Sequence, residues 1–201
     1  MDSALETAIR PGSCPHLAML LSHRDEVAPT LASFYALGAK RNGWLFHRSI
    51  EGRAETDRAD LAAAGLDVAR LEAEGRMVFS EISLDITVED YVHAWEPEMN
   101  AALARGFAAA WWARFPIGPD AEILERSVAY DAAWDAHFHD RPCVSLCLFI
   151  VRDVERDRRA AQLALTIHAH PTLSETVGFS AELAEGTITD IMPKRKRAAK
   201  A

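Results

Sequence analysis

Residues 143–151 have the sequence Cys-Val-Ser-Leu-Cys-Leu-Phe-Ile-Val, an apolar run of the length of one strand. A strand that is apolar on both faces is typical of the centre of a parallel sheet covered by helices on each side. Outward from this run, helix-forming stretches alternate with shorter apolar runs at 17–21, 44–47, 77–80 and 107–115. This alternation predicts a three-layer α/β fold, with a mostly parallel sheet and helices on both faces.

The stretches between these runs have sequence signals for helix ends. Residues 25–40 carry apolar side chains at helical spacing, and Thr56 begins a short helix that Gly65 ends. We expect 66–74 to be a connector. A longer helix follows from Thr87, with a kink or break at Pro97. Beyond it, the pattern predicts helices over about 118–138 and 156–169, and edge strands at 172–179 and 187–191.

Length and charge define the expected organisation. The chain has 201 residues and a net charge of -8, which suits one globular domain. We expect a leader over 1–15, a single domain over 16–192 and a disordered basic tail over 193–201. The tail holds five basic residues and no acid, so the rest of the chain is strongly acidic. We therefore expect no contact with nucleic acid other than through the tail.

Composition also indicates the compartment. No apolar run reaches the roughly 18 residues of a membrane span. The N-terminus lacks the basic and apolar regions of a signal peptide. Three cysteines without a Cys-x-x-Cys spacing indicate reduced thiols. We expect a cytoplasmic protein with no membrane contact.

Several catalytic motifs are missing from the sequence. It contains no Gly-x-x-x-x-Gly-Lys-(Ser/Thr) phosphate loop, no Gly-x-Gly-x-x-Gly and no Gly-x-Ser-x-Gly. The usual motifs for ATP hydrolysis, dinucleotide binding and α/β-hydrolase chemistry are therefore absent. We expect a protein that is not an enzyme and that needs no cofactor.

A ligand site is predicted at the carboxyl ends of the strands, where ligands bind in open parallel sheets. Arginines near these ends would orient the polar or anionic end of a ligand, and aromatic residues would supply apolar walls. The candidate contacts are His47, Arg48, Trp111, Arg114, Tyr130 and Arg152.

Two His-x-His pairs leave an alternative open. Both pairs fall at expected helix ends, where histidines commonly cap the last carbonyls. If the pairs met in space they could instead bind a metal for a metal-dependent enzyme. That set is His137, His139, Asp140, His168 and His170. A third alternative is an oligomeric interaction module without a ligand.

The order of short motifs from about Gly12 to Gly178 resembles the MEDS domain, the methanogen/methylotroph dichloromethane-regulator sensory domain. The resemblance depends on turns, connectors and strand ends that recur in order. They are Gly12–His16, Leu37–Asn42, Gly65–Val68, Glu74–Met77, Ala102–Phe107, Tyr130-Asp131, Cys147–Phe149 and His170-Pro171.

This resemblance implies a RecA- or KaiC-like fold that lacks the phosphate loop, and a role in sensing a small molecule. It also implies a separate signalling or transcription-regulator protein as partner, because we expect no output module within these residues. Self-association into a homo-oligomer stays open. The chain departs from the family around 110–115, where Ala-Trp-Trp-Ala-Arg-Phe replaces the usual arginine and Gly-Glu. The ligand could therefore differ from that of other members.

Overall fold

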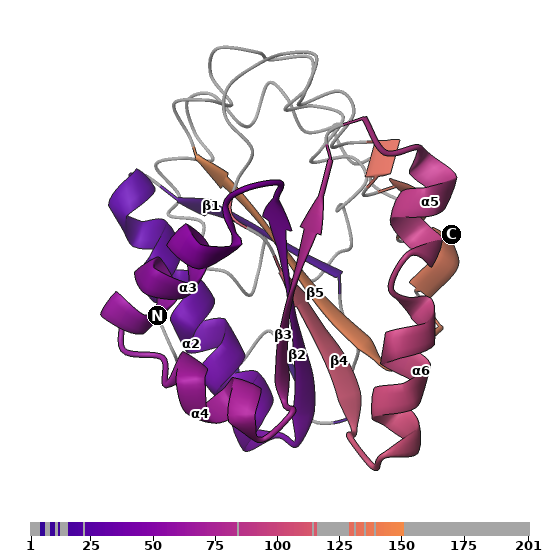
Figure 1. Ribbon diagram of the computed structural model, residues 1–201, viewed down its shortest axis with the longest axis horizontal. Coiled ribbons are helices and arrows are strands. Elements are labelled where there is room, and N and C mark those ends of the chain that lie inside the picture. The colour runs from indigo at the N-terminus through magenta and orange to yellow at the C-terminus, as the bar shows by residue number, and fades with distance from the viewer. Residues whose placement is uncertain are drawn as a thin grey trace, which may run out of the picture.

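The computed structural model describes residues 5–6, 9–10, 12, 16–21, 23–83, 85–113, 115, 129–130, 132–134, 136–138 and 140–150. Five strands in this part form one parallel sheet in the order β1-β5-β4-β2-β3 (Figure 1). They are β1 His16–Leu21, β2 Gly43–Ile50, β3 Met77–Ile82, β4 Ala109–Ala113 and β5 Cys143–Ile150. The α/β class is confirmed. The apolar run of β5 predicted the central strand, and β5 is indeed flanked on both sides, by β1 and β4, although β4 holds the middle position among the five strands described.

Helices connect the strands on both sides of the sheet (Figure 1). Between β1 and β3 come η1 Arg24–Glu26, α2 Val27–Lys40, α3 Ala54–Ala63 and α4 Val68–Ala73. Between β3 and β4 come α5 Val88–His93 and α6 Glu96–Ala104. Helical residues 129–130, 132–134 and 136–138, here called the Trp134 helix, precede β5.

The direction of the connections explains which face each helix covers. The chain crosses the sheet one way from β1 through β2 to β3, then returns through β4 to β5. Right-handed crossovers therefore put α2, α3 and α4 on one face and α5, α6 and the Trp134 helix on the other. Two neighbouring residues of β4 show this, since Trp111 contacts Phe34 of α2 and Trp112 contacts Trp134.

Two local features differ from the prediction or refine it. The segment expected as a connector contains α4, because Asp67 caps the Arg70 amide at 3.2 Å and Val68 and Leu71 are buried. The break expected at Pro97 is confirmed: α5 ends at His93, and Pro97 lies in the first turn of α6.

The α5 face of the sheet has an aromatic core. Trp95 stacks on Phe46 at 4.9 Å and on Trp134 at 4.6 Å, with interplanar angles of 16° and 7°. Trp112 stacks on Trp134 at 4.5 Å. These contacts attach the junction of α5 and α6 firmly to the Trp134 helix.

Other expectations fall outside the described residues. The helix at 156–169, the edge strands at 172–179 and 187–191 and the tail at 193–201 all stay predictions. Among the residues described, no helix combines the length and the apolar character that crossing a membrane requires.

Candidate functional site

A cleft of about 640 Å³ lies at the carboxyl edge of the sheet. It is bounded by the ends of β2 and β3, by Phe115 two residues after β4, by the start of α2 with the turn before it, and by α3 with the residue before it. The connection that follows β2 covers one face and the connection that follows β4 covers the other, so a crevice forms between these two strand ends. The lining residues are Arg24, Asp25, Val27, Ala28, Pro29, Arg48, Ile50, Arg53, Asp57, Asp60, Ala63, Ala64, Ile82 and Phe115.

The cleft combines apolar walls with balanced charge. Three arginines and three aspartates line it, while valine, alanine, proline, isoleucine and phenylalanine side chains form the rest. Arg53, the residue before α3, pairs with Asp57 of α3 at 3.5 Å, although the Arg53 side chain is 51% exposed and the Asp57 side chain only 2%. The polar or zwitterionic end of a ligand could therefore take the place of the exposed Arg53 side chain beside Asp57, whose buried carboxylate is already held in place.

A buried polar chain runs from the wall of this cleft into the α2 face. His47 Nε2 lies 3.4 Å from Asp57 Oδ2, and His47 Nδ1 lies 2.9 Å from the Tyr35 hydroxyl. The tautomer with hydrogen on Nε2 suits both contacts, because Nε2 then donates to Asp57 and Nδ1 can accept the single hydroxyl hydrogen of Tyr35, for which the Ala113 carbonyl is the alternative acceptor. The Tyr35 oxygen also lies 3.1 Å from the Ala113 carbonyl at the end of β4.

Burial controls the ionisation of this chain. Desolvation lowers the pKa of His47, although Asp57 acts in the opposite direction. Burial also raises the pKa of the Tyr35 hydroxyl well above its ordinary value. Desolvation alone would raise the pKa of Asp57, but the hydrogen bond from His47 and the nearby charge of Arg53 outweigh it and lower that pKa. At neutral pH this hydrogen-bonded series therefore consists of the ionised Asp57 carboxylate and the uncharged rings of His47 and Tyr35.

Arg48, the residue after His47, points to the opposite face of the sheet. It is 2% exposed, and its Nη1 donates to the Tyr91 carbonyl of α5 at 3.0 Å. Its guanidinium lies 4.9 Å from the Tyr91 ring centroid, a cation–π contact. Because Arg48 also lines the cleft, it connects the cleft to α5.

The other predicted contacts divide into two groups. Arg114 and Arg152 lie outside the described residues. Trp111 and Tyr130 are described, and neither lines the cleft. Trp111 is 2% exposed and packs under α2, where a Cβ on Gly38 would approach its indole to 2.7 Å. Trp111 is among the expected ligand contacts, but it packs beneath α2 and does not line the cleft, and Trp112 beside it is covered from the other face by Trp134.

Tyr130 lies on the α5 face, away from the cleft lining. Its hydroxyl donates to the Ile86 carbonyl at 2.7 Å, and its ring stacks on Tyr91 at 4.5 Å. These contacts fix the Trp134 helix to the segment before α5. Tyr130 thus belongs with the aromatic core, and Arg48 reaches the same Tyr91 from the cleft side.

Sequence reasoning missed the residues that α2 and α3 contribute to the cleft. Asp57 and Arg53 lie on α3 or at its start, and Tyr35 lies on the inner face of α2. Nothing in their spacing from His47 reveals that they meet. An acid in the first turn of the helix that follows a His-bearing strand is the only signal that points to Asp57.

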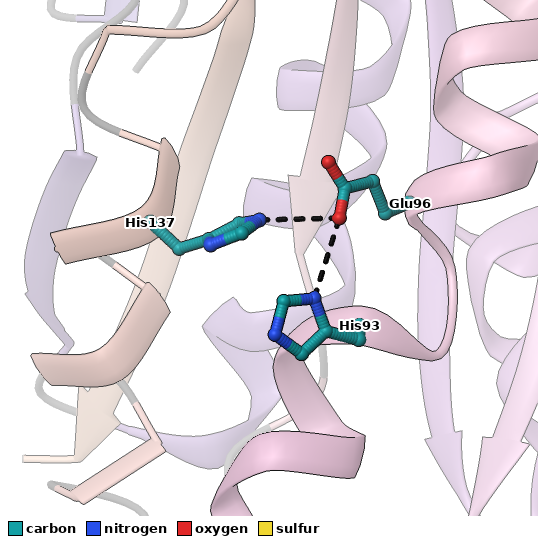
Figure 2. A group of neighbouring side chains, drawn as sticks. All are labelled: His93, Glu96 and His137. Carbon is teal, nitrogen blue, oxygen red and sulfur yellow. Dashed lines mark hydrogen bonds and ion pairs between the residues drawn. The ribbon is translucent and has the colours of Figure 1, made fainter.

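A second cluster surrounds Glu96 on the opposite side of the sheet (Figure 2). His93 Nδ1 lies 3.3 Å and His137 Nε2 lies 3.2 Å from Glu96 Oε2. Arg141 Nη1 donates to the other oxygen, Oε1, at 2.5 Å. Hydrogen bonds from Arg141 and His93 lower the pKa of Glu96 to about 2.

Only His137 and Asp140 of the predicted metal set are described. His139, His168 and His170 lie outside the described residues, so the predicted meeting of the two His-x-His pairs is not tested. The structure brings His137 to His93 and to Glu96, which is 41 residues away in the sequence, a meeting that spacing could not indicate.

Comparison with known proteins gives two kinds of similarity. The profile of the MEDS family, described as the methanogen/methylotroph, DcmR sensory domain, matches residues 15–171. Short segments are similar to dihydrolipoyl dehydrogenases. One from Buchnera aphidicola subsp. Acyrthosiphon pisum is 56% identical over 39 residues, and one from Vibrio cholerae serotype O1 is 60% identical over 38 residues. Each match covers 19% of this chain and 8% of the relative.

Proposed function

Because this chain belongs to the MEDS family of sensory domains, we propose that it binds a small organic ligand in the cleft at the carboxyl edge of the sheet. The bound state signals through a separate signalling or transcription-regulator protein. The role is regulatory, not enzymatic, and it is exercised in the cytoplasm.

The observation that carries this proposal is the pairing of the cleft with the buried chain from Asp57 to Tyr35. Apolar walls and a few convergent polar groups are typical of small-molecule sites. Here the polar groups are the Arg53–Asp57 pair at 3.5 Å and the His47 ring behind it. This arrangement supports a ligand with an apolar body and one polar or zwitterionic end.

The same residues offer a route for the signal. A ligand can shift an equilibrium only if it binds two conformations with different affinity. Asp57 connects the cleft to α2 through His47 and Tyr35, and Arg48 connects it to α5 through Tyr91. A ligand that competes for Asp57 or Arg48 would change contacts on both faces of the sheet. The outer surfaces of α2 and α5 are then the natural places for a partner to sense the change.

The first test is native mass spectrometry of the freshly purified chain, compared with its denatured mass. A small organic mass that is lost on denaturation supports the proposal, and its identity supplies the ligand for later work. A bare native mass leads to a thermal-stability screen with small carboxylic acids and amino acids. A ligand at 100 times its Kd should stabilise the folded chain by about 2.7 kcal/mol.

A matched pair of variants locates the site. Arg53→Ala removes a side chain that lines the cleft and is 51% exposed. Arg70→Ala removes one that is 57% exposed, is also ion-paired and lies on α4 away from the cleft. Ligand-induced stabilisation should fall in Arg53→Ala and persist in Arg70→Ala. Equal responses of the two variants, or no stabilising compound at all, would oppose the proposal.

A further inference from the structure

We propose that His93, Glu96 and His137 form a binding site for a divalent transition-metal ion, with Zn²⁺ as the best fit. This site is separate from the cleft and does not depend on the proposed sensory role. It also differs from the metal set predicted from the sequence, with which it shares only His137.

The fold brings the three residues together from different elements (Figure 2). His93 is the last residue of α5 and Glu96 is the first residue of α6, so the break between these helices turns both side chains the same way. His137 comes from the Trp134 helix. One ligand atom from each residue lies within 4.8 Å of the others. Imidazole nitrogens and a carboxylate oxygen are common zinc ligands, and two histidines with one glutamate leave a position open.

The separations between these atoms suit a tetrahedral ion. Zinc bonds of about 2.0–2.1 Å at tetrahedral angles place neighbouring ligand atoms about 3.3 Å apart. Two of the three separations here are 3.3 Å and 3.2 Å, from Glu96 Oε2 to His93 Nδ1 and to His137 Nε2. An ion could therefore replace the hydrogens between these atoms with little movement of the side chains.

The surroundings hold the ligands in place. Arg141 bonds Glu96 Oε1 and also Asn100 at 2.6 Å, which fixes the carboxylate plane and leaves Oε2 facing the two rings. Such outer hydrogen bonds orient the ligands of metal sites. Below the cluster, Trp95 stacks on Trp134 at 4.6 Å and fixes the α5–α6 break to the helix that carries His137.

The cluster is also open to an ion from solution. The His93 side chain is 52% exposed, the His137 side chain 29% and the Glu96 side chain 24%. Water can fill the remaining coordination position. A bound ion would link the α5–α6 break to the Trp134 helix and stabilise the packing of this face.

The test uses the full chain after treatment with a chelator and dialysis. Titration with Co²⁺ should produce visible d–d absorption that saturates at one equivalent, and Zn²⁺ should displace it. His93→Gln and His137→Gln should each weaken Zn²⁺ binding by at least about 10-fold. Glutamine keeps an N–H donor for Glu96 but is a poor zinc ligand, so these variants separate metal binding from hydrogen bonding. His23→Gln, which changes an exposed histidine in the turn before α2, is the control and should bind like the parent.

Two results would overturn the proposal. One is a parent chain that shows no saturable absorption at one equivalent of Co²⁺. The other is full-affinity binding in both His93→Gln and His137→Gln, which would place any ion on other histidines of the chain. Circular dichroism at each step shows that the variants are folded, and the exposed position of His93 makes its variant the safer of the two.

Discussion

Replacing Gly43 with alanine should lower the free energy of unfolding by about 3 kcal/mol, at the upper end of the range for overpacked cores. The added Cβ would lie 2.3 Å from Trp111 Cδ1, 2.6 Å from Trp111 Nε1 and 2.8 Å from the Gly38 carbonyl oxygen. Ordinary contact begins at 3.4 Å, so the indole would have to retreat by 1.1 Å. The indole is itself buried and packs against Phe34 at 5.0 Å, and the Gly38 oxygen belongs to the backbone, so neither neighbour can give way cheaply.

Gly38→Ala provides a graded comparison at the same indole. Its Cβ would lie 2.7 Å from Trp111 and 2.8 Å from the flexible end of Leu45. Alanine also improves helix propensity by about 1 kcal/mol. The net loss in Gly38→Ala should therefore be smaller, about 1 kcal/mol.

The assay is urea denaturation followed by circular dichroism, because tryptophan fluorescence would change with the variants themselves. A double-mutant cycle with Trp111→Leu isolates the contact. A smaller side chain at 111 leaves room for the alanine methyl, so the losses should fall short of additivity by at least about 1 kcal/mol. Additive losses, or a Gly43→Ala variant as stable as the parent, would refute the packing of Trp111 between the two glycines.

The remaining predictions concern pH and local contacts. Burial lowers the pKa of His47, so the unfolded protein binds a proton near pH 6.5 more readily than the folded protein does. The free energy of unfolding should therefore keep its full value above that pH and decrease as the pH falls below it. His47→Gln should flatten this part of the profile in urea melts and His23→Gln should not; equal slopes would contradict the assignment. Thr87→Ala should lower the free energy of unfolding by about 1 kcal/mol, because it removes the side-chain oxygen that accepts from the Asp90 amide at the start of α5. An unchanged urea midpoint would show that this cap does not stabilise the protein. Tyr130→Phe should lower the free energy of unfolding by about 1 kcal/mol, because it removes the hydrogen bond to the Ile86 carbonyl. Urea melts test this, and Tyr35→Phe, which removes another buried hydroxyl, provides the comparison.

The candidate site was only partly predictable. His47 and Arg48 follow from one rule, that ligands gather at the carboxyl ends of parallel strands, and both residues lie at the cleft or directly behind it. The rule does not say where β4 ends or which helix covers its side chains, so it could not show that Trp111 packs beneath α2. Asp57, Arg53 and Tyr35 come from helices, and the sequence does not show how a helix is rotated or positioned against the sheet.

By itself the sequence determined the class of fold and the family, and it predicted a site at the edge of the sheet where the cleft lies. Hydrophobic periodicity and helix-end signals are local, so 143–151 reads as a central strand and Pro97 as a break without knowledge of any other segment. Tertiary structure alone decided which side chains meet. His47 lies beside Asp57 and Tyr35, and His93 lies beside His137, because crossover direction and aromatic packing bring distant helices to the same place. Those contacts depend on interactions between segments that no short stretch of sequence contains.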